Sequence, residues 1–307
     1  MNRPRVSVIS VNYNQPDVTC DMLASLRQVT YPDVEVIVVD NGSSVPCNRI
    51  SREFPEVKLI KSAENLGFAG GNNLGIDQAT GKYLLFLNND TEVEPGFLEP
   101  LVELLEDNPD IGMVSPKIKF YHHRELIQYA GYSRLNIRTL RMKGLGYGRK
   151  DDGSFDRITE THFAHGAAMM VPRRVIDKVG KMPDIYFLYY EEHDWCIRVK
   201  RAGFKVYYHP QSVVWHKESV STGRNSALQT YYMTRNRILF GRRNIAGLPS
   251  KLSAAYMILI AFPKNLVELM IKRESANLKA YLRAIWWHCE KLFKRFRVPD
   301  TRPGAVY

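Results

Sequence analysis

Two clusters of polar side chains in this 307-residue chain have the residue types that bind metal ions or move protons. The first is Asn88-Asn89-Asp90, which follows the apolar run 83–87. Carboxylate oxygens suit Mg²⁺ or Mn²⁺, and a cation bound to a diphosphate takes only one or two ligands from the protein. From these three residues alone, a turn stabilised by Asx side chains is favoured, and a metal site is the alternative.

The second cluster contains three carboxylates, Glu191, Glu192 and Asp194, around His193 and directly after the aromatic run 187–190. Adjacent carboxylates without a neighbouring Lys or Arg repel each other. This repulsion is expected to raise the pKa of at least one of them, which suits a general base. Acidic residues are also favoured in the first turn of a helix. The residues alone leave both interpretations open.

The segment 64–76 is rich in glycine, with Gly67, Gly70, Gly71 and Gly75. Glycines at the start of a helix leave backbone N–H groups accessible, and the helix dipole there favours phosphate. The spacing matches neither the dinucleotide motif nor the P-loop. A binding loop and a tight turn into a well-packed helix therefore stay equally open.

One histidine is a further candidate ligand. His216 follows the apolar run 213–215. A histidine in this position is a structural side chain more often than a metal ligand. From its position alone, the structural interpretation is favoured.

Alternating strand and helix patterns predict how these groups are positioned. Over the first hundred residues the pattern indicates βαβ units and a mostly parallel sheet, whose ligands lie beyond the carboxyl ends of the strands. Residues 12–14, 40 and 88–90 follow such ends, whereas 117–161 is expected to be irregular. Strands are expected at 5–12, 34–40, 57–61, 83–87 and 205–209, and helices at 17–28, 67–79, 97–108 and 186–202.

The composition is that of a folded globular protein, with 45% hydrophobic and 24% charged residues, enough for one large core or two small ones. The four cysteines are scattered and form no C-x-x-C pair, which argues against a disulfide framework or a zinc ribbon and suits a reducing cytosol. No secretory signal is visible, so a cytosolic chain is expected.

Positive charge is concentrated near the C-terminus. Residues 235–297 contain 14 Lys and Arg against three acidic residues, and the rest of the chain is neutral. This surplus predicts a polyanionic partner, either nucleic acid or an anionic membrane, with a solvated helix surface as the alternative.

The same region favours the membrane over nucleic acid. The uncharged apolar run 252–263 has only 12 residues before Lys264 and Glu268 interrupt it, so no spanning helix is expected. Residues 281–297 mix Trp, Phe and Leu with Lys and Arg, which is typical of a helix in the headgroup layer. They contain no nucleic-acid-binding module.

Seven motifs, taken in order, resemble the inverting family 2 glycosyltransferases of the GT-A fold, in particular their rhamnosyltransferase-like branch. The similarity extends from about Val6 to Arg243. It implies an α/β fold with a Rossmann-like, mostly parallel sheet flanked by helices, followed by a C-terminal amphipathic helical tail. The motifs lie at 6–14, 39–43, 65–73, 87–90, 165–171, 190–195 and 215–219.

The resemblance also implies a division of the chain. Residues 1–227 would form the catalytic domain, with a nucleotide-sugar half at about 1–115 and an acceptor half at about 116–227. Residues 228–307 would form a basic, helical, membrane-associating region.

Roles for individual residues follow from the same resemblance. Asn88-Asn89-Asp90 occupies the Asp-x-Asp position, so Asp90 would be the metal carboxylate and His216 the second ligand to Mg²⁺ or Mn²⁺. Asp40 would meet the nucleotide base, and Gly166 and Ala167 would lie where donor sugar and acceptor meet. The implied nucleotide-sugar pocket consists of Asn12, Tyr13, Asp40, Asn65, Gly67, Phe68, Asn72, Asn88, Asn89, Gly166 and Ala167.

The base motif departs from that of the family. Relatives generally have Glu-Asp-x-Asp, whereas this chain has Glu191-Glu192-His193-Asp194. Glu192 would be the catalytic base with one extra methylene, and Glu191 and Asp194 stay as alternatives. The longer side chain can shift the geometry enough to affect the rate.

The implied reaction is the inverting transfer of a sugar from a dTDP- or UDP-linked donor, with L-rhamnose from dTDP-rhamnose as the first choice. The acceptor would be lipid-linked or a polysaccharide in bacterial cell-surface glycan synthesis, and the enzyme would sit peripherally on the anionic inner face of the cell membrane. Alternatives are transfer of galactose, glucose or N-acetylglucosamine to a glycan or protein, and a nucleotide-sugar-binding protein without catalysis.

Overall fold

The computed structural model describes residues 3–217 and 225–293, with the side chains of 292 and 293 left out. The chain forms two compact units. Of the described residues, the sheet unit contains 3–133, 143–187 and 191–217, and the helical unit contains 134–142, 188–190 and 225–293. The helical unit thus includes two short segments that lie far before the expected division at residue 227.

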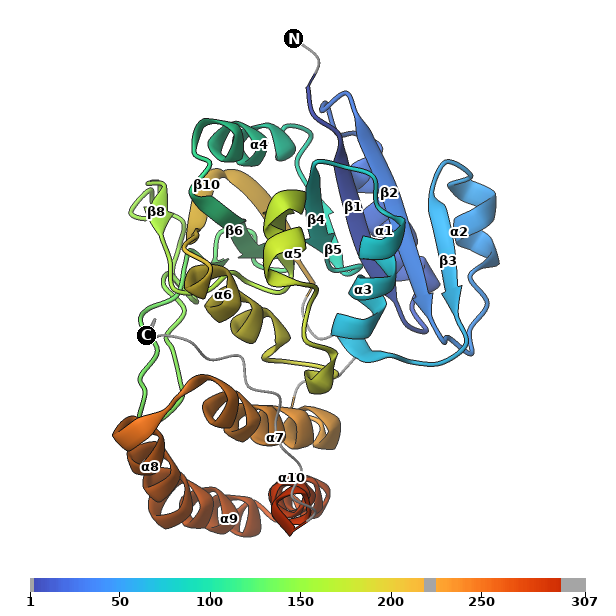
Figure 1. Ribbon diagram of the computed structural model, residues 1–307. Helices are drawn as coiled ribbons and strands as arrows, with labels where there is room; N and C mark the ends of the chain where they lie inside the picture. The colour runs from blue at the N-terminus through green and yellow to red at the C-terminus, as the bar shows by residue number, and fades with distance from the viewer. Residues whose placement is uncertain (1–2, 218–224, 294–307) are drawn as a thin grey trace. The chain divides into compact units, whose positions relative to one another are not determined.

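The first half of the sheet unit is the parallel arrangement that the alternating pattern predicts. Its strands are hydrogen-bonded side by side in the order β3-β2-β1-β4, and all neighbours are parallel (Figure 1). The elements of this half are β1 (Val6–Asn12), α1 (Pro16–Leu26), β2 (Val34–Asn41), α2 (Asn48–Glu53), β3 (Lys58–Ser62), α3 (Gly67–Gln78) and β4 (Tyr83–Leu87).

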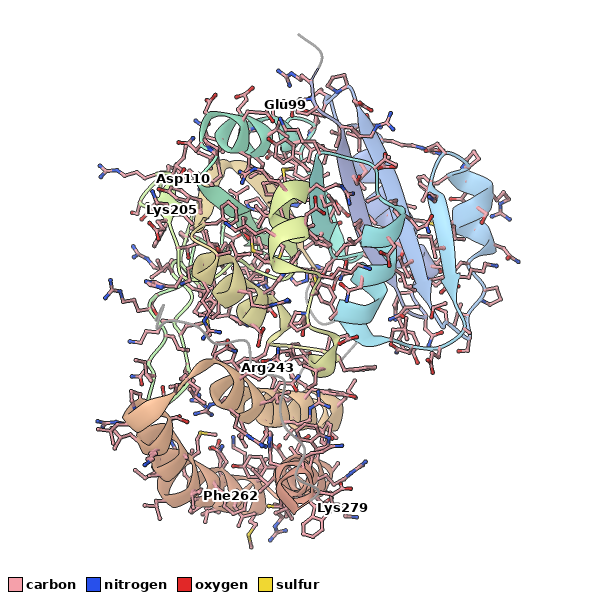
Figure 2. The ribbon with its side chains drawn as sticks, in the orientation of Figure 1. Glu99, Asp110, Lys205, Arg243, Phe262 and Lys279 are labelled. Carbon is pink, nitrogen blue, oxygen red and sulfur yellow. The ribbon has the colours of Figure 1, made fainter. Side chains whose placement is uncertain are left out.

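Beyond β4 the sheet is mixed. It continues in the order β9-β6-β10-β5, where β9 is antiparallel to both of its neighbours and β10 is parallel to β6. Asp110 and Lys205 form a 2.6 Å ion pair where β6 and β10 begin (Figure 2). The elements of this half are β5 (Thr91–Val93), α4 (Leu98–Asp107), β6 (Ile111–Phe120), β7 (Ile127–Tyr129), β8 (Thr159–Glu160), β9 (Ala168–Pro172), α5 (Arg173–Val179), α6 (Glu191–Arg201) and β10 (Lys205–His216).

Alternation along β1 places apolar side chains on both faces of the sheet. Val6 and Val8 belong to the main core together with Met22 and Leu23 of α1. Ile9 faces α3 instead, where a Cβ on Gly75 would come within 2.3 Å of its Cγ2. Burial of each such side chain contributes about 1.5–3 kcal/mol, so the buried β1 is a main source of stability.

Two elements differ from the prediction. The helix expected at 186–202 begins only at Glu191, because Phe187, Tyr189 and Tyr190 have φ angles of 66°, 67° and 77°, which no α-helix contains. The strand expected at 205–209 extends to His216 through an irregularity between His209 and Val213. Periodicity alone signals neither feature, because both arise from contacts with distant segments.

The helical unit consists mainly of α7 (Ala227–Asn244), α8 (Gly247–Tyr256), the π-helical turn η2 (Met257–Ala261), α9 (Phe262–Ile271) and α10 (Ser275–Phe293). Helices α7 and α10 pack together, with Nε2 of buried His288 hydrogen-bonded at 2.8 Å to the carbonyl of Arg235. Phe262 of α9 stacks on Tyr281 of α10 at 5.7 Å between ring centroids.

The described residues contain one helix that is long and apolar enough to cross a membrane, judged by length and composition only, at Gly247–Ile271. From the sequence, the uncharged apolar segment is expected to have only 12 residues, at 252–263. The structure corrects that length, because the helix continues through η2 and past Pro263, and Lys264 and Glu268 do not interrupt it. Almost none of its apolar window is buried within the chain.

Candidate active site

A chain of buried hydrogen bonds connects the carboxyl ends of β1, β2 and β4 with α1. Parallel pairing sets Asn12 opposite Asp40, and Asn12 Nδ2 donates to Asp40 Oδ1 at 3.3 Å. The Thr19 hydroxyl donates to Asn12 Oδ1 at 2.9 Å and accepts from Asn89 Nδ2 at 3.0 Å. This network fixes Asn12 and Asp40 at the strand ends, beside the 39% exposed side chain of Tyr13.

Asp90 and His216 are brought together by the antiparallel pairing of β5 with β10. Asp90 Oδ1 lies 3.1 Å from His216 Nε2, and both side chains are buried. On the other side of the ring, His216 Nδ1 lies 2.9 Å from Gln128 Oε1. Gln128 thereby fixes the ring orientation and holds the Nδ1 proton, which leaves Nε2 directed at the carboxylate.

This pair fits a divalent cation. With Nδ1 protonated, Nε2 and a carboxylate oxygen are both acceptors, so they approach to 3.1 Å only with a proton or a cation between them. Two adjacent ligands of an octahedral Mg²⁺ at 2.0–2.1 Å lie about 3 Å apart, which is the separation found here. Asn88 Nδ2 is 3.4 Å from the same Nε2.

The described residues contain no group of three His, Cys, Asp or Glu side chains that could hold a metal ion. A cation bound to Asp90 and His216 therefore needs further ligands from outside the protein. Diphosphate oxygens and water are the ligands that Mg²⁺ keeps in such sites, so two protein ligands are sufficient.

Backbone N–H groups of the glycine-rich segment form hydrogen bonds within the protein. The N–H of Phe68 donates to the carbonyl of Phe187 at 2.6 Å, and the N–H of Gly67 donates to Asn65 Oδ1 at 2.9 Å. A Cβ on Gly67 would lie 2.2 Å from the Phe187 carbonyl oxygen. The structure therefore favours the tight turn over a phosphate-binding helix start, because these two N–H groups have protein acceptors.

Other members of the predicted pocket also make internal hydrogen bonds. Asn72 is buried and donates to the carbonyl of Phe68 at 2.9 Å. The N–H of Asn88 donates to the carbonyl of Ala167 at 2.9 Å, which ties β4 to the segment before β9. A Cβ on Gly166 would lie 3.5 Å from Glu192 Oε1. Gly166 therefore lies next to the Glu192 side chain.

Glu192 and His193 form a mostly buried pair at the start of α6. Glu192 Oε1 is 3.3 Å from His193 Nδ1. Burial raises the pKa of Glu192, but the charge of His193 and its hydrogen bond outweigh burial and lower the pKa overall. The expected repulsion among acids therefore does not govern Glu192, which is ionised at neutral pH as a base must be.

The two alternative bases lie deeper. Asp194 is fully buried and accepts a 2.7 Å hydrogen bond from the Tyr186 hydroxyl, with Arg198 Nε at 3.6 Å from its other oxygen. Glu191 is also buried, with 3% of its surface exposed. Asp194 has the contacts of a structural carboxylate. Glu192 is therefore better placed than Asp194 to act as the base.

Two rings that sequence reasoning gave no role lie between the Asp90–His216 pair and Glu192. The ring of His165 is 6.2 Å from that of His216 and stacks on Tyr132 at 6.2 Å, and Tyr132 is 5.8 Å from His193. Burial, followed by the charge of His216, lowers the pKa of His165 to about 3. His165 is therefore neutral at physiological pH, and its Nδ1 accepts the N–H of Ala167 at 3.1 Å.

No motif or spacing in the sequence marks Gln128, Tyr132 or Thr19 as residues of the site. Gln128 and Tyr132 lie in the stretch 117–161 that was expected to be irregular, and Thr19 lies inside a helix. His165 alone carried a signal, because it begins the motif 165–171. Glu218 and Ser219, the last two residues of the motif 215–219, lie outside the described residues.

Within the helical unit, Asn236 of α7 holds the segment just before α6. Fully buried Asn236 donates from Nδ2 to the carbonyls of Leu188 and Tyr189, at 2.6 Å and 2.8 Å. Positive φ angles at Tyr189 and Tyr190 are costly for such bulky residues, and such strain persists only where other contacts enforce it. The segment continues directly into Glu191 and Glu192.

The comparison with protein families identifies the class. The model of glycosyl transferase family 2 matches residues 7–180. Because this match covers more than half of the chain, the protein belongs to glycosyl transferase family 2, as the motifs predicted. It is a glycosyltransferase of glycan biosynthesis.

Individual proteins agree with this class. The chain is 28% identical over 239 residues to the low-salt glycan biosynthesis hexosyltransferase Agl10 of Haloferax volcanii, covering 76% of this chain and 74% of that protein. It is 25% identical over 250 residues to the N-acetylglucosaminyl-diphospho-decaprenol L-rhamnosyltransferase of Mycobacterium tuberculosis, covering 72% and 78%.

The fold is confirmed by a solved structure. The mannosyltransferase PcManGT of Pyrobaculum calidifontis, in complex with GDP-Man and Mn²⁺, aligns with a TM-score of 0.58 and 20% identity. The alignment covers 97% of this chain and 83% of that one. The predicted GT-A fold is therefore correct, with a mixed sheet flanked by helices.

Proposed function

We propose that this protein is a metal-dependent, inverting glycosyltransferase that moves a hexose from a nucleoside diphosphate to a lipid-linked or polysaccharide acceptor. The observation that carries the proposal is the buried Asp90–His216 pair, 3.1 Å apart at the carboxyl ends of the strands. In a GT-A fold this is the edge at which ligands are bound.

On the donor side, Asn12, Tyr13 and Asp40 would contact the nucleotide. Asp90 and His216 would hold the divalent cation, which when bound neutralises the charge that develops on the departing diphosphate. Gln128 keeps the His216 ring in the orientation that this requires. The N–H groups of Gly67 and Phe68, which have protein acceptors, are left out of this role.

On the acceptor side, Glu192 would take the proton of the attacking hydroxyl. Its lowered pKa keeps the carboxylate ionised, and its position against Gly166 places it beside the segment that is tied to Asn88 through Ala167. The hydroxyl would attack the anomeric carbon from the side opposite the diphosphate. A single displacement inverts that centre and needs no covalent intermediate.

The donor we propose is dTDP-L-rhamnose. The likeness to the M. tuberculosis L-rhamnosyltransferase, whose name describes a decaprenol-linked acceptor, supports both this sugar and a lipid-linked acceptor. A different hexose is the second candidate, because the H. volcanii relative is named only as a hexosyltransferase and the solved relative was crystallised with GDP-Man.

A panel of nucleotide sugars tests the donor. It contains dTDP-rhamnose, UDP-glucose, UDP-galactose, UDP-N-acetylglucosamine and GDP-mannose, each with Mn²⁺, Mg²⁺ or chelator. We expect nucleotide release from dTDP-rhamnose that requires the cation. Release from another hexose donor would favour the second candidate, and cation-independent release would contradict the metal role.

We further propose that the helical unit attaches the enzyme to the membrane surface. Its helix 247–271 exposes large apolar side chains to solvent, with Ile258, Leu259 and Ile271 at 67%, 73% and 77% exposure. Such exposure is unfavourable in water and is relieved when the face enters a lipid surface. Pelleting of the full chain with vesicles tests this attachment.

A further inference from the structure

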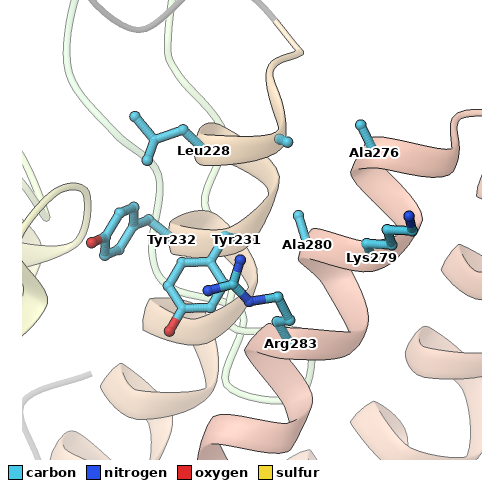
Figure 3. A pocket seen from close by; sticks show the side chains of 8 residues that line it. Leu228, Tyr231, Tyr232, Ala276, Lys279, Ala280 and Arg283 are labelled. Carbon is cyan, nitrogen blue, oxygen red and sulfur yellow. The ribbon is translucent and has the colours of Figure 1, made fainter.

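A groove lies between α7 and α10, within the helical unit. Its volume is about 400 Å³, and Figure 3 shows Tyr231 of α7 and Arg283 of α10 next to each other between the two helices. It is lined by Ala227, Leu228, Tyr231, Tyr232, Ala276, Lys279, Ala280 and Arg283.

The charges of this groove have one sign. Lys279 and Arg283 line it one helical turn apart, and no carboxylate is among the lining residues. The Arg283 guanidinium lies 5.9 Å from the ring centre of Tyr231, so a cation–π contact holds it toward α7. The groove therefore offers two positive charges in a defined geometry, and the described residues that line it include no carboxylate to neutralise them.

A third cation, Arg235, lies next to the aromatic side chains near the groove. The guanidinium of buried Arg235 lies 4.9 Å from the Tyr232 ring and 5.0 Å from the Trp287 ring. These contacts hold the rings of Tyr232 and Trp287 against Arg235.

Exposed apolar side chains flank the two cations. Leu282 and Trp286 on α10 are 44% and 65% exposed. The spacing of Lys279, Leu282, Arg283 and Trp286 sets them on one side of the helix. Cations beside an exposed Trp and Leu are typical of a helix at the level of lipid headgroups.

We infer that this groove binds the phosphate of an anionic lipid headgroup, with Lys279 and Arg283 as its cationic contacts. The inference rests on the proposed membrane attachment and makes it more specific. An anionic headgroup supplies a negative charge that the described lining residues do not provide, while Leu282 and Trp286 enter the adjoining lipid. Attachment would then depend on two defined cations and not only on the overall positive charge of the region.

Vesicle binding of two charge-matched double variants tests this inference. Lys279→Gln/Arg283→Gln removes the groove cations, and Lys251→Gln/Lys264→Gln removes two exposed cations outside the groove on α8 and α9. Partitioning is measured on phosphatidylcholine vesicles with and without phosphatidylglycerol. Equal melting temperatures of the variants and the wild type show that both variants are folded.

We expect the groove variant to lose at least ten times more affinity for the anionic vesicles than the control variant. If the region is held only by non-specific electrostatic attraction to anionic lipid, each cation near the membrane surface contributes about 1 kcal/mol. The two variants should then lose equal affinity. Equal losses would overturn the groove as a headgroup site while leaving membrane attachment intact. A wild-type chain that binds neither vesicle would contradict the attachment itself, and the headgroup site with it.

Discussion

At the level of single residues, the contacts of each side chain distinguish the members of the two polar clusters, 88–90 and 191–194. Some are engaged in structural hydrogen bonds, and others are placed for the proposed reaction. Asn89 faces Thr19 and belongs to the buried network, whereas Asp90 faces His216. Asp194 is engaged by the Tyr186 hydroxyl, whereas Glu192 lies against Gly166. Each cluster therefore contains one residue for the proposed reaction beside one that supports the structure.

Glu192→Gln should abolish sugar transfer, with at least a 100-fold loss of kcat, because an amide cannot accept the hydroxyl proton. Nucleotide binding should be unchanged. Asp194→Asn is the matched comparison. It disturbs a buried hydrogen bond and should lower the melting temperature, whereas Glu192→Gln should not. Full turnover by Glu192→Gln in a coupled nucleotide-release assay would exclude Glu192 as the base.

The sequence marked both clusters, but it did not predict how Glu192 interacts with its neighbours. Three acids in four residues predict mutual repulsion, yet the partner nearest to Glu192 is His193, which lowers its pKa. Gln128 could not be found because nothing in its local sequence marks it. It matters only because folding places it beside a residue 88 positions away.

Among the elements, the turn before α6 illustrates how one helix holds another segment in a strained shape. Asn236→Ala removes two hydrogen bonds from the carbonyls of Leu188 and Tyr189. The segment should relax, and the start of α6 with it. A displacement of about 1 Å can cost on the order of 100-fold in rate, so kcat should fall by at least tenfold.

The same variant should leave KM for the donor within about twofold, because Asp40, Asp90 and His216 lie on other elements. Asn236→Asp should behave like the Ala variant, since a carboxylate cannot donate to a carbonyl. The separate effects on kcat and KM identify a positioning role. A parallel loss in donor binding would instead indicate general unfolding.

The packing of α3 on β1 gives a test of stability. Gly75→Ala places a Cβ 2.3 Å from Ile9 Cγ2 in a fully buried contact. Overpacking of this kind costs about 1–3 kcal/mol, and the better helix propensity of Ala offsets up to about 1 kcal/mol. The free energy of unfolding should fall by about 1–2 kcal/mol in urea titrations. Gly96→Ala, which meets no atom within 4 Å, is the control and should have no such effect.

Most elements could be predicted because their patterns are local. The buried strands β1, β2 and β4 are β-branched and apolar runs, and α4 has a clear amphipathic repeat. The antiparallel insertion of β9 and the pairing of β5 with β10 could not be predicted, since strand order is set by long-range packing. The left-handed turn at 187–190 likewise depends on Asn236, which lies about 50 residues later in the chain.

For the whole molecule, pH should act on stability through buried His209 of the sheet unit. Burial lowers the pKa of His209 to about 4 from an ordinary value of 6.5. Between these values the unfolded chain binds a proton that the folded chain does not. The free energy of unfolding should therefore fall as pH drops from 6.5 to 4, by about 1 kcal/mol per pH unit for this group.

His209→Asn retains an acceptor for the N–H of Gln211 but cannot titrate. Urea titrations at pH 7 and pH 5 should show a smaller loss of stability for this variant than for the wild type. Identical pH dependence of the two proteins would show that His209 is not the group responsible.

The molecule as a whole also shows why the C-terminal region is hard to read from sequence. Charge counting found its basic character, and the apolar run 252–263 suggested a short segment. Continuity of the helix from Gly247 to Ile271 depends on η2, which joins α8 and α9 without a break. Burial of Tyr281, Ala284 and His288 of α10 is a consequence of packing that charge counting does not register.

The central claim is that Asp90 and His216 hold a divalent cation together with a nucleoside diphosphate. Electron spin-echo spectroscopy of Mn²⁺ bound with that nucleotide tests it directly, because it detects a coordinating ring nitrogen. We predict a nitrogen coupling in the wild type that disappears in His216→Ala. Asp90→Ala should weaken Mn²⁺ binding at least tenfold and abolish cation-dependent turnover. A wild-type spectrum without nitrogen coupling, or one that His216→Ala leaves unchanged, would contradict the claim.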